Sequence, residues 1–304
     1  MSERHPIIAI TGSSGAGTST VTRTFSNIFR REGVKAAIIE GDSFHRFDRA
    51  EMKQRAADAE KAGNKHFSHF GPDNNLFDEI ENLFKTYSQN GSGKFRKYLH
   101  NAEEAAPYKQ EPGTFTPWES LADDTDILFY EGLHGAVVTP QNDIAQYPDL
   151  RVGVVPVINL EWIQKLWRDK HQRGYSTEAV TDTILRRMPD YIHYICPQFE
   201  HTHVNFQRVP MVDTSNPFIA RDIPSADESM VVIRFANPKG IDFQYLLTMI
   251  DGSFMSRANT IAVPGGKMEL AMQLIFTPFV WRMIERRKRA FGQGQGDSYD
   301  ERKC

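Results

Sequence analysis

Short apolar runs rich in β-branched residues alternate with amphipathic segments along the chain. Such runs are typical of buried strands, and apolar residues spaced three or four apart are typical of helices that cover a sheet. Strands are predicted at 6–12, 34–44, 124–135, 151–160, 210–214 and 230–235. Helices are predicted at 19–31, 49–63, 78–87, 160–173, 177–191 and 268–289.

This alternation predicts an α/β fold with a mixed, mostly parallel sheet flanked by helices. We interpret 1–290 as one domain whose helices at about 160–191 form a lid. The segment 88–118 is too long and polar to be an ordinary connection, which favours a functional loop. The polar, glycine-rich end, 291–304, is expected to be disordered.

Composition narrows the classes of partner. The formal net charge is only -3, so no overall field favours nucleic acid or an anionic membrane. The longest apolar stretch, 152–160, is about half the length of a membrane span. The N-terminal residues lack the pattern of a secretion signal, and the two cysteines, Cys196 and Cys304, do not suggest a disulfide framework. We therefore expect a cytoplasmic protein.

The sequence GSSGAGTS, which begins at Gly12, resembles the phosphate-binding pattern G-x-x-x-x-G-K-S/T. A glycine-rich turn between a strand and a helix directs backbone N–H groups and the helix dipole toward a polyphosphate. This context favours a P-loop kinase-like, adenylate-kinase-like fold over a merely flexible turn. The residues predicted to bind the nucleotide here are Gly12, Ser13, Ser14, Gly15, Ala16, Gly17, Thr18, Ser19 and Thr20. The Ser19 hydroxyl is also predicted to bind Mg²⁺.

The usual lysine of this pattern is replaced by Thr18, so either the protein does not transfer phosphate or another cation reaches the same place. The helix EWIQKLWRDKHQR offers one. Lys165, Arg168, Asp169, Gln172 and Arg173 share one helical face, and Ile163, Leu166 and Trp167 are expected to anchor the helix elsewhere. With Arg186 and Arg187 on the next helix, we interpret the pair as a cationic lid. The alternative is an ordinary solvated charged face.

Carboxylates follow two of the predicted strands. Glu131 is predicted to bind Mg²⁺, because this ion requires oxygen ligands and the residue ends a buried run. Asp169 is a second, weaker metal candidate. Asp42 ends the second strand, close to where the phosphate loop would hold the nucleotide, and is predicted to accept the proton of an attacking alcohol. His45 and Arg49 follow at helical spacing and are predicted to bind the substrate.

Several segments resemble bacterial phosphoribulokinases of the octameric class. They are GSSGAGTS, GDSFHRFDR, LFYEGLHG, EWIQKLWRDKHQRGYSTEAVTDTILRRM and VDTSNPFIARDIPSADES. The resemblance extends from about residue 3 to residue 285, and the threonine in the loop is itself a mark of that class. It implies transfer of the ATP γ-phosphate to the 1-hydroxyl of D-ribulose 5-phosphate in the Calvin cycle, with Mg²⁺.

The resemblance also implies roles for single residues. Asp42 would be the base, Asp169 a further catalytic acid, and Lys165 the cation that Thr18 lacks. The residues assigned to the sugar phosphate are His45, Arg49, Arg173, Lys53, Tyr98 and His100. The residues assigned to the lid or the nucleotide are Arg168, Arg186 and Arg187.

Regulation follows from the resemblance as well. The class forms homo-octamers that are activated by NADH and inhibited by AMP. It is similar to this chain at three arginines that would contact the allosteric anion, namely Arg31, Arg234 and Arg257.

Two alternative functions stay open. One is another small-molecule P-loop kinase, such as a uridine or pantothenate kinase. The other is a non-catalytic nucleotide-binding regulator, which a loop without lysine would suit.

Overall fold

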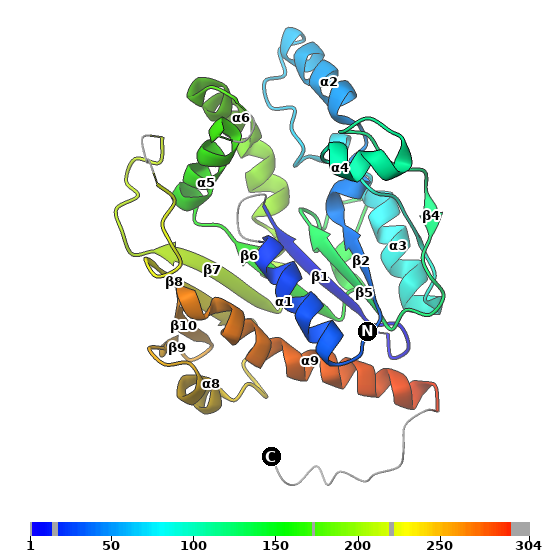
Figure 1. Ribbon diagram of the computed structural model, residues 1–304, viewed down its shortest axis with the longest axis vertical. Coiled ribbons are helices and arrows are strands. Elements are labelled where there is room, and N and C mark those ends of the chain that lie inside the picture. The colour runs from blue at the N-terminus through cyan, green and yellow to red at the C-terminus, as the bar shows by residue number, and fades with distance from the viewer. Residues whose placement is uncertain (1, 14–17, 172–173, 219–221, 293–304) are drawn as a thin grey trace.

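An eight-stranded sheet forms the centre of the protein (Figure 1). This computed structural model describes residues 2–13, 18–171, 174–218 and 222–292. The strands lie in the order β2-β5-β1-β6-β7-β8-β10-β9, and the first five are parallel. Their bounds are β1 (Ile7–Gly12), β2 (Ala36–Glu40), β5 (Ile127–Gly132), β6 (Leu150–Val155), β7 (Val204–Pro210), β8 (Ser229–Phe235), β9 (Phe254–Arg257) and β10 (Thr260–Pro264). The predicted mixed, mostly parallel sheet is confirmed.

Helices cover both faces of this sheet. In Figure 1, α1 and α9 cross one face, α3 covers the other, and α5 and α6 rise beyond the carboxyl ends of the central strands, across from α2. The helices are α1 (Thr18–Arg31), α2 (Arg49–Lys61), α3 (Phe77–Asn90), α4 (Ala102–Ala105), α5 (Ile158–His171), α6 (Thr177–Asp190), α7 (Gln198–His201), α8 (Phe243–Met249) and α9 (Met268–Ala290). A one-turn 3₁₀ helix, η1 (Gly41–Phe44), follows β2.

The central strands are continuous apolar runs because both of their faces are buried. All six residues of β1 are buried. Ile8 and Ile10 pack in the core beneath α1 and α9, whereas Ile7 and Ala9 pack in the core beneath α3. Alternate residues of one strand therefore supply two separate cores, which explains why no polar position interrupts the run.

Aromatic rings join α1 to α9 above the sheet. The Phe276 ring of α9 lies 4.8 Å from that of Phe25 on α1 and 5.4 Å from that of Phe206 on β7. All three side chains are almost fully buried. The predicted helical spacing of Phe25 in α1 is thus confirmed by the face that the helix buries.

The structure differs from the sequence prediction in several places. The strands predicted at 34–44 and 151–160 end at Glu40 and Val155, where helices follow, and β9 and β10 were not predicted. The strand predicted at 210–214 is wrong, because β7 ends at Pro210, whose nitrogen cannot donate to a ladder, and Met211 beyond it is exposed. The long segment 88–118 also contains local structure. Its strand β3 (Lys94–Phe95) pairs with β4 (Glu119–Ser120) just after the segment, and α4 lies between them.

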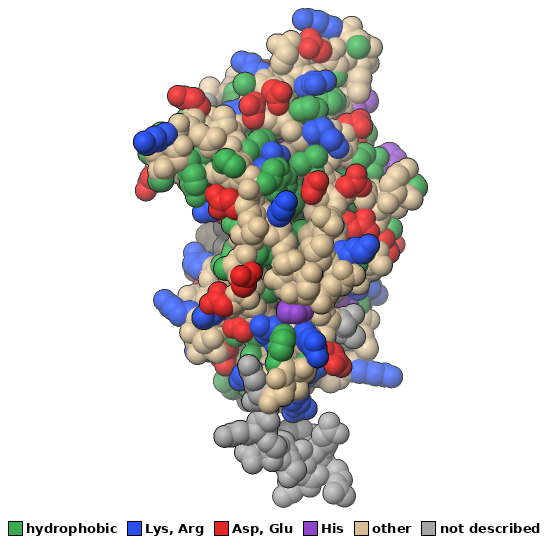
Figure 2. All heavy atoms as spheres, turned by 90° about the vertical axis from the view of Figure 1, so that its right-hand side faces the viewer, with side chains coloured by type: hydrophobic (Ala, Val, Ile, Leu, Met, Phe, Trp, Pro, Cys, Tyr) green, Lys and Arg blue, Asp and Glu red, His purple; other side chains and the backbone are tan. Residues whose placement is uncertain are grey.

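The surface carries both signs of charge. Figure 2 shows basic and acidic side chains interspersed over the side of the molecule that carries α3. This mixture agrees with a formal net charge of only -3. Within the described ranges, no helix is both long and apolar enough to span a membrane.

Replacing Phe276 with alanine tests the α1–α9 core. Phe276→Ala should lower the free energy of unfolding by about 3–5 kcal/mol, because it removes a buried ring and leaves a cavity. Phe254→Ala is the matched control, since the Phe254 side chain is 53% exposed, and should cost less than about 1 kcal/mol. Urea unfolding followed by circular dichroism measures both. Equal losses would contradict this account of the core.

Candidate active site

The carboxyl ends of β2 and β5 bring acidic residues to one edge of the sheet. Glu40 lies opposite Glu131 in the register, and Glu131 lies opposite Ile10 of β1. Asp42 follows Glu40 in η1. The strand of the predicted metal ligand therefore lies between the strand of the predicted base and the strand that leads into the phosphate loop.

Two glycines allow η1 to approach the end of β5. A Cβ on Gly132 would lie 2.7 Å from the Cα of Gly41, and a Cβ on Gly41 would lie 2.6 Å from the Tyr130 hydroxyl. Contacts this short do not occur for real side chains, so a larger residue at either position would push η1 away. The glycine pair therefore sets how closely Asp42 approaches Glu131.

His45 links Asp42 to an amide whose orientation is fixed. Its Nε2 lies 3.3 Å from Asp42 Oδ1, and its Nδ1 lies 2.9 Å from Asn75 Oδ1. The amide nitrogen of Asn75 donates to the carbonyls of His69 and Gly71, so the Asn75 oxygen is the atom left to accept. Both ring nitrogens of His45 thus face acceptors, which is the arrangement of an imidazolium.

These contacts keep Asp42 ionised. Burial opposes ionisation, but the hydrogen bond from His45 and the charges of nearby histidines lower the pKa of Asp42 below its usual range. Burial also disfavours charge on His45, yet its bonds to Asp42 and Asn75 raise its pKa overall. The Asp42 side chain is 42% exposed, so a ligand can reach the carboxylate.

Three residues predicted to bind the substrate lie beside this pair. His100 Nε2 lies 3.8 Å from Asp42 Oδ2. Arg49 donates from Nη2 to the His100 carbonyl at 2.8 Å, and its guanidinium lies 6.0 Å from the centre of the Tyr98 ring. A cation and two aromatic groups thus form one wall around the Asp42 carboxylate.

The other two predicted substrate residues are not part of this wall. Lys53 is exposed on α2, one helical turn beyond Arg49. Arg173 lies outside the described residues. Arg49 is therefore the arginine that the structure places at the predicted sugar-phosphate site.

Arg96 holds the backbone that follows the predicted base. Its Nε donates to the Ser43 carbonyl at 2.9 Å, and its Nη2 donates to the His45 carbonyl at 2.7 Å. The guanidinium lies 3.7 Å from the centre of the Phe115 ring and 4.9 Å from that of Trp118. Arg96 belongs to the long segment 88–118. Its two hydrogen bonds and two aromatic contacts therefore hold this segment against η1.

Lys165 and Asp169 form a buried ion pair on α5. Lys165 Nζ donates to Asp169 Oδ2, and Arg168 Nε donates to Asp169 Oδ1 at 3.1 Å. Burial and the charge of Arg187 lower the pKa of Lys165 to about 8, although Asp169 opposes this shift. In the described part of the predicted cationic face, Lys165 and Asp169 are therefore buried, whereas Gln172 and Arg173 lie outside the described residues. Trp167, expected to anchor α5, is instead 37% exposed, because that side of the helix faces solvent.

The two arginines of α6 have different surroundings. Arg187, in addition to burial, disfavours the charged forms of Lys165 and His45, so it lies near both. Arg186 pairs with Glu60 of α2, Nη2 to Oε2 at 3.3 Å. In this structure Arg187 lies beside the candidate site, whereas Arg186 joins α6 to α2 at the surface.

The predicted phosphate loop lies partly outside the described residues, which omit 14–17 and the side chains of Thr18 and Ser19. β1 ends at Gly12, the following Ser13 is buried, and α1 begins at Thr18. The strand and helix that the loop motif requires are therefore confirmed on both sides of it.

Glu131 fits the predicted metal site. Its side chain is half-buried at the end of β5, opposite Glu40 in the register. The described residues contain no group of three or more potential metal ligands. A magnesium ion carried by nucleotide phosphates takes one or two protein carboxylates and keeps several waters, so this position is suitable for it.

Within a single chain, the three arginines predicted to bind effectors do not all lie close together. Arg234 and Arg257 both lie opposite Thr260 in the register of β10. Arg31 ends α1 and donates to Thr277 of α9 at 2.7 Å. The neighbours of Arg234 on β8 pack in the core beneath α9, so Arg234 projects from the opposite face of the sheet to Arg31.

Sequence reasoning missed four residues of the site, namely Glu40, His69, Asn75 and Arg96. The His69 ring centre lies 5.1 Å from that of His45, and burial together with the His45 charge lowers the pKa of His69 well below its usual value. No local periodicity marks these positions. An arginine with aromatic residues in the same long loop was the one available signal for Arg96.

Comparisons with known proteins indicate one family of kinases. The family described as Phosphoribulokinase / Uridine kinase family matches residues 7–215. A chromosomal phosphoribulokinase of Cupriavidus necator is 78% identical over 290 residues, which are 95% of this chain and 99% of that protein. The phosphoribulokinase of Nitrobacter vulgaris is 66% identical over 95% of this chain and 100% of its own. A solved structure described as phosphoribulokinase from Rhodobacter spheroides is 58% identical, covers 94% of this chain and 100% of its own, and has a TM-score of 0.88.

Asp42→Asn should lower the pKa of His45, because a neutral amide no longer stabilises the imidazolium. In the unmodified protein, His45 should titrate above the usual value of about 6.5. NMR titration of the imidazole nitrogens measures both. His203, whose pKa burial and the Arg151 charge lower to about 4, is the internal control and should not change. An unaltered His45 titration in the variant would contradict the proposed ion pair.

Proposed function

This chain belongs to the Phosphoribulokinase / Uridine kinase family, its activity is that of a phosphoribulokinase, and we propose that Asp42 is the base of the reaction. The γ-phosphoryl group of ATP passes to the 1-hydroxyl of D-ribulose 5-phosphate, giving ribulose 1,5-bisphosphate and ADP in Calvin cycle carbon fixation. Both substrates and the use of Mg²⁺ follow from the family. The assignment of residues to steps is our proposal.

The observation that carries this proposal is the Asp42–His45 pair at the end of β2. Phosphoryl transfer depends mainly on positioning and charge, because the attacking alcohol loses its proton late. A strongly basic group is therefore not required. Asp42 is ionised, partly exposed and held by His45, so it is suited to orient the 1-hydroxyl and to accept its proton.

The sugar phosphate would bind against the wall formed by Arg49, Tyr98 and His100. We assign its phosphate to Arg49, whose guanidinium donates charge-assisted hydrogen bonds, and to the positive charge of His45. Both ring N–H groups of His45 already face Asp42 and Asn75, so His45 would act through its charge alone. Tyr98 and His100 lie within the same wall and would contact the hydroxyl groups. Lys53 and Arg173 complete the proposed substrate set.

Lys165 is proposed to replace the cation that Thr18 does not provide. Its ammonium is buried and bonded to Asp169, so it acts in a region of low dielectric, where charge is more effective. The proposed nucleotide set is 12–20 together with Arg168, Arg186 and Arg187. Glu131 and Ser19 are the proposed ligands of Mg²⁺, which would neutralise charge on the transferred phosphate.

Three further properties are proposed on the resemblance alone. They are activation by NADH, inhibition by AMP and assembly into a homo-octamer. Arg31, Arg234 and Arg257 stay candidates for effector contacts, although Arg31 and Arg234 project from opposite faces of the sheet. The cytoplasmic location also stays a prediction, as does a single domain over 1–290 with a lid at about 160–191.

The alternatives considered from the sequence are less well supported. A uridine or pantothenate kinase would share the lid, but the high identities to phosphoribulokinases extend over 95% of this chain. A non-catalytic regulator would not need an ionised, ligand-accessible Asp42 beside a wall of cationic and aromatic residues. Release of ADP with ribulose 5-phosphate, and none with uridine or pantothenate, distinguishes all three possibilities in a coupled assay.

Asp42→Asn should lower kcat by about 10²–10⁴-fold, because the amide cannot accept the proton. The affinity for Mg-ATP should be unchanged, since the nucleotide binds at the loop after β1. The coupled assay gives kcat, and calorimetry gives the nucleotide affinity. Retention of more than half of the activity would exclude Asp42 as the base.

Lys165→Met should lower kcat by about 10²–10³-fold while changing ATP affinity much less, because the proposed contact forms mainly in the transition state. Lys170→Met is the matched control on the exposed side of α5 and should retain activity. In the unmodified enzyme, kcat should also fall as the pH rises past about 8, where Lys165 loses its proton. Equal losses in kcat and ATP affinity would show that Lys165 only anchors the nucleotide.

A further inference from the structure

Glu40 places a second carboxylate at the reaction site, beside the proposed base. It ends β2 directly before η1, the short helix that carries Asp42. Ala37 and Ile39 of the same strand pack in the core beneath α3. Because side chains alternate along a strand, Glu40 projects from the other face of the sheet. Its side chain is 65% exposed, so a ligand can reach the carboxylate.

The fold does not account for this carboxylate. Glu40 precedes the first turn of η1, but its side chain does not cap that helix. In the described parts of the chain, the Glu40 carboxylate accepts no hydrogen bond of normal length, and its nearest cationic group is the His100 ring. A negative charge close to Asp42 also opposes the approach of an anionic sugar phosphate. Such a charge weakens substrate binding unless it contacts the substrate directly.

His100 lies between the two carboxylates. Its Nε2 is 3.9 Å from Glu40 Oε2 and 3.8 Å from Asp42 Oδ2. Because both neighbours of this nitrogen are acceptors, a hydrogen on Nε2 is favoured. Both distances are too long for a hydrogen bond. A small polar group beside the gap can therefore bond to the imidazole and to Glu40 together.

A hydroxyl group suits this gap better than the other groups of the substrate. It accepts a hydrogen bond from His100 Nε2 and donates its own hydrogen to Glu40, whereas a ketone only accepts and a phosphate is repelled by the carboxylate. The His100 backbone carbonyl accepts from Arg49, at the proposed phosphate end of the site. Asp42 marks the proposed 1-hydroxyl end. The groups between these two ends of the substrate include the hydroxyls of carbons 3 and 4.

We propose that Glu40 is a specificity-determining residue, which accepts a hydrogen bond from the 3- or 4-hydroxyl of D-ribulose 5-phosphate while His100 donates to the same hydroxyl. The inference rests on the site proposed around Asp42. A site built to bond a substrate hydroxyl rejects analogues that lack it, because its polar groups are then left unpaired.

Variants of Glu40 test the contact. Glu40→Ala should raise the KM for ribulose 5-phosphate by at least about tenfold, the loss typical of one charge-assisted hydrogen bond. Glu40→Gln should raise it less, because the amide oxygen can still accept. The KM for Mg-ATP should be unchanged, and kcat should change less than the sugar KM. A lower sugar KM in either variant would mean that Glu40 only repels the anionic substrate, and would overturn the proposal.

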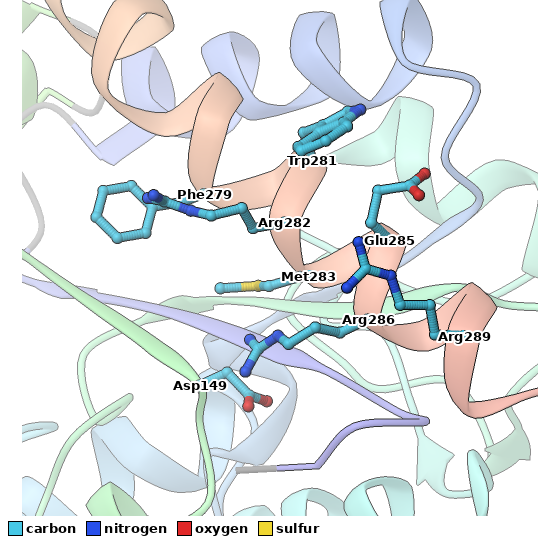
Figure 3. A pocket seen from close by; sticks show the side chains of 8 residues that line it. All are labelled: Asp149, Phe279, Trp281, Arg282, Met283, Glu285, Arg286 and Arg289. Atoms are coloured by element: carbon cyan, nitrogen blue, oxygen red, sulfur yellow. The ribbon is translucent and has the colours of Figure 1, made fainter. Parts of the chain in front are cut away.

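Two other glutamates are controls for the loss of one negative charge. Glu103 is exposed on α4, in the same long segment as His100. Glu285 lies on α9, where it lines a hollow together with Asp149 (Figure 3). Asp149 precedes the parallel strand β6, so this hollow lies at the opposite edge of the sheet from Asp42. Glu103→Gln and Glu285→Gln should keep the sugar KM of the unmodified enzyme. A rise equal to that of Glu40→Gln would overturn the proposal.

Substrate analogues connect Glu40 to one hydroxyl. Analogues of ribulose 5-phosphate that lack the 3-hydroxyl or the 4-hydroxyl are compared with the parent compound, in the unmodified enzyme and in Glu40→Ala. With the analogue that lacks the bonded hydroxyl, the variant should lose less than about twofold in kcat/KM, because the contact is already absent. With the other analogue it should lose as much as with the parent. Equal losses with all three compounds would overturn the proposal.

Further outcomes separate this inference from the proposed function. Weaker binding of Mg²⁺ or Mg-ATP by Glu40→Ala, with an unchanged sugar KM, would make Glu40 a metal ligand beside Glu131 and would overturn the inference. Full activity of Asp42→Asn would refute the proposed base, whatever the Glu40 variants do. An unchanged sugar KM in both Glu40 variants, with Asp42→Asn inactive, would refute the role of Glu40 alone.

Discussion

The close approach of Gly41 to Gly132 is the constraint on which the reaction site depends. Asp42 lies in η1 and Glu131 on β5, so the backbone distance between η1 and the end of β5 limits how closely the two carboxylates can approach. A side chain on either glycine would place an atom less than 3 Å from its neighbour. The proposed base and metal ligand thus share a site because two positions carry no side chain.

Charge is then arranged around this geometry in two ion pairs. Asp42 with His45 is partly open to solvent, whereas Lys165 with Asp169 is buried. Each pair contains one group to which we assign a role in the reaction and one that holds it in its charged form. His45 keeps Asp42 ionised, and Asp169 opposes the loss of the Lys165 proton that burial favours. Both partners therefore matter for the charge state as well as for position.

The sequence predicted the central sheet because β1 and β5 are buried on both faces, which produces continuous apolar runs. Asp42 and Glu131 became candidates for the base and the metal ligand because the sequence places each near the end of a recognisable apolar strand, and these roles stay predictions. The sequence could not predict Arg96, whose partners are the carbonyl groups of Ser43 and His45 about 50 residues earlier. Burial of Lys165 was missed for a related reason. Helical periodicity shows which residues share a face, but packing against the rest of the protein decides whether that face is exposed.

The buried position of Lys165 also bears on the proposal that this residue replaces a loop lysine. A buried ammonium is costly unless an anion accompanies it, and Asp169 provides that anion in this structure. If Lys165 binds the phosphate as proposed, its ammonium would exchange one anionic partner for another without first returning to water. Asp169 therefore offsets the desolvation cost of the Lys165 ammonium before the nucleotide binds. A cation prepared in this way can stabilise charge in the transition state without the reorganisation that a solvated lysine would need.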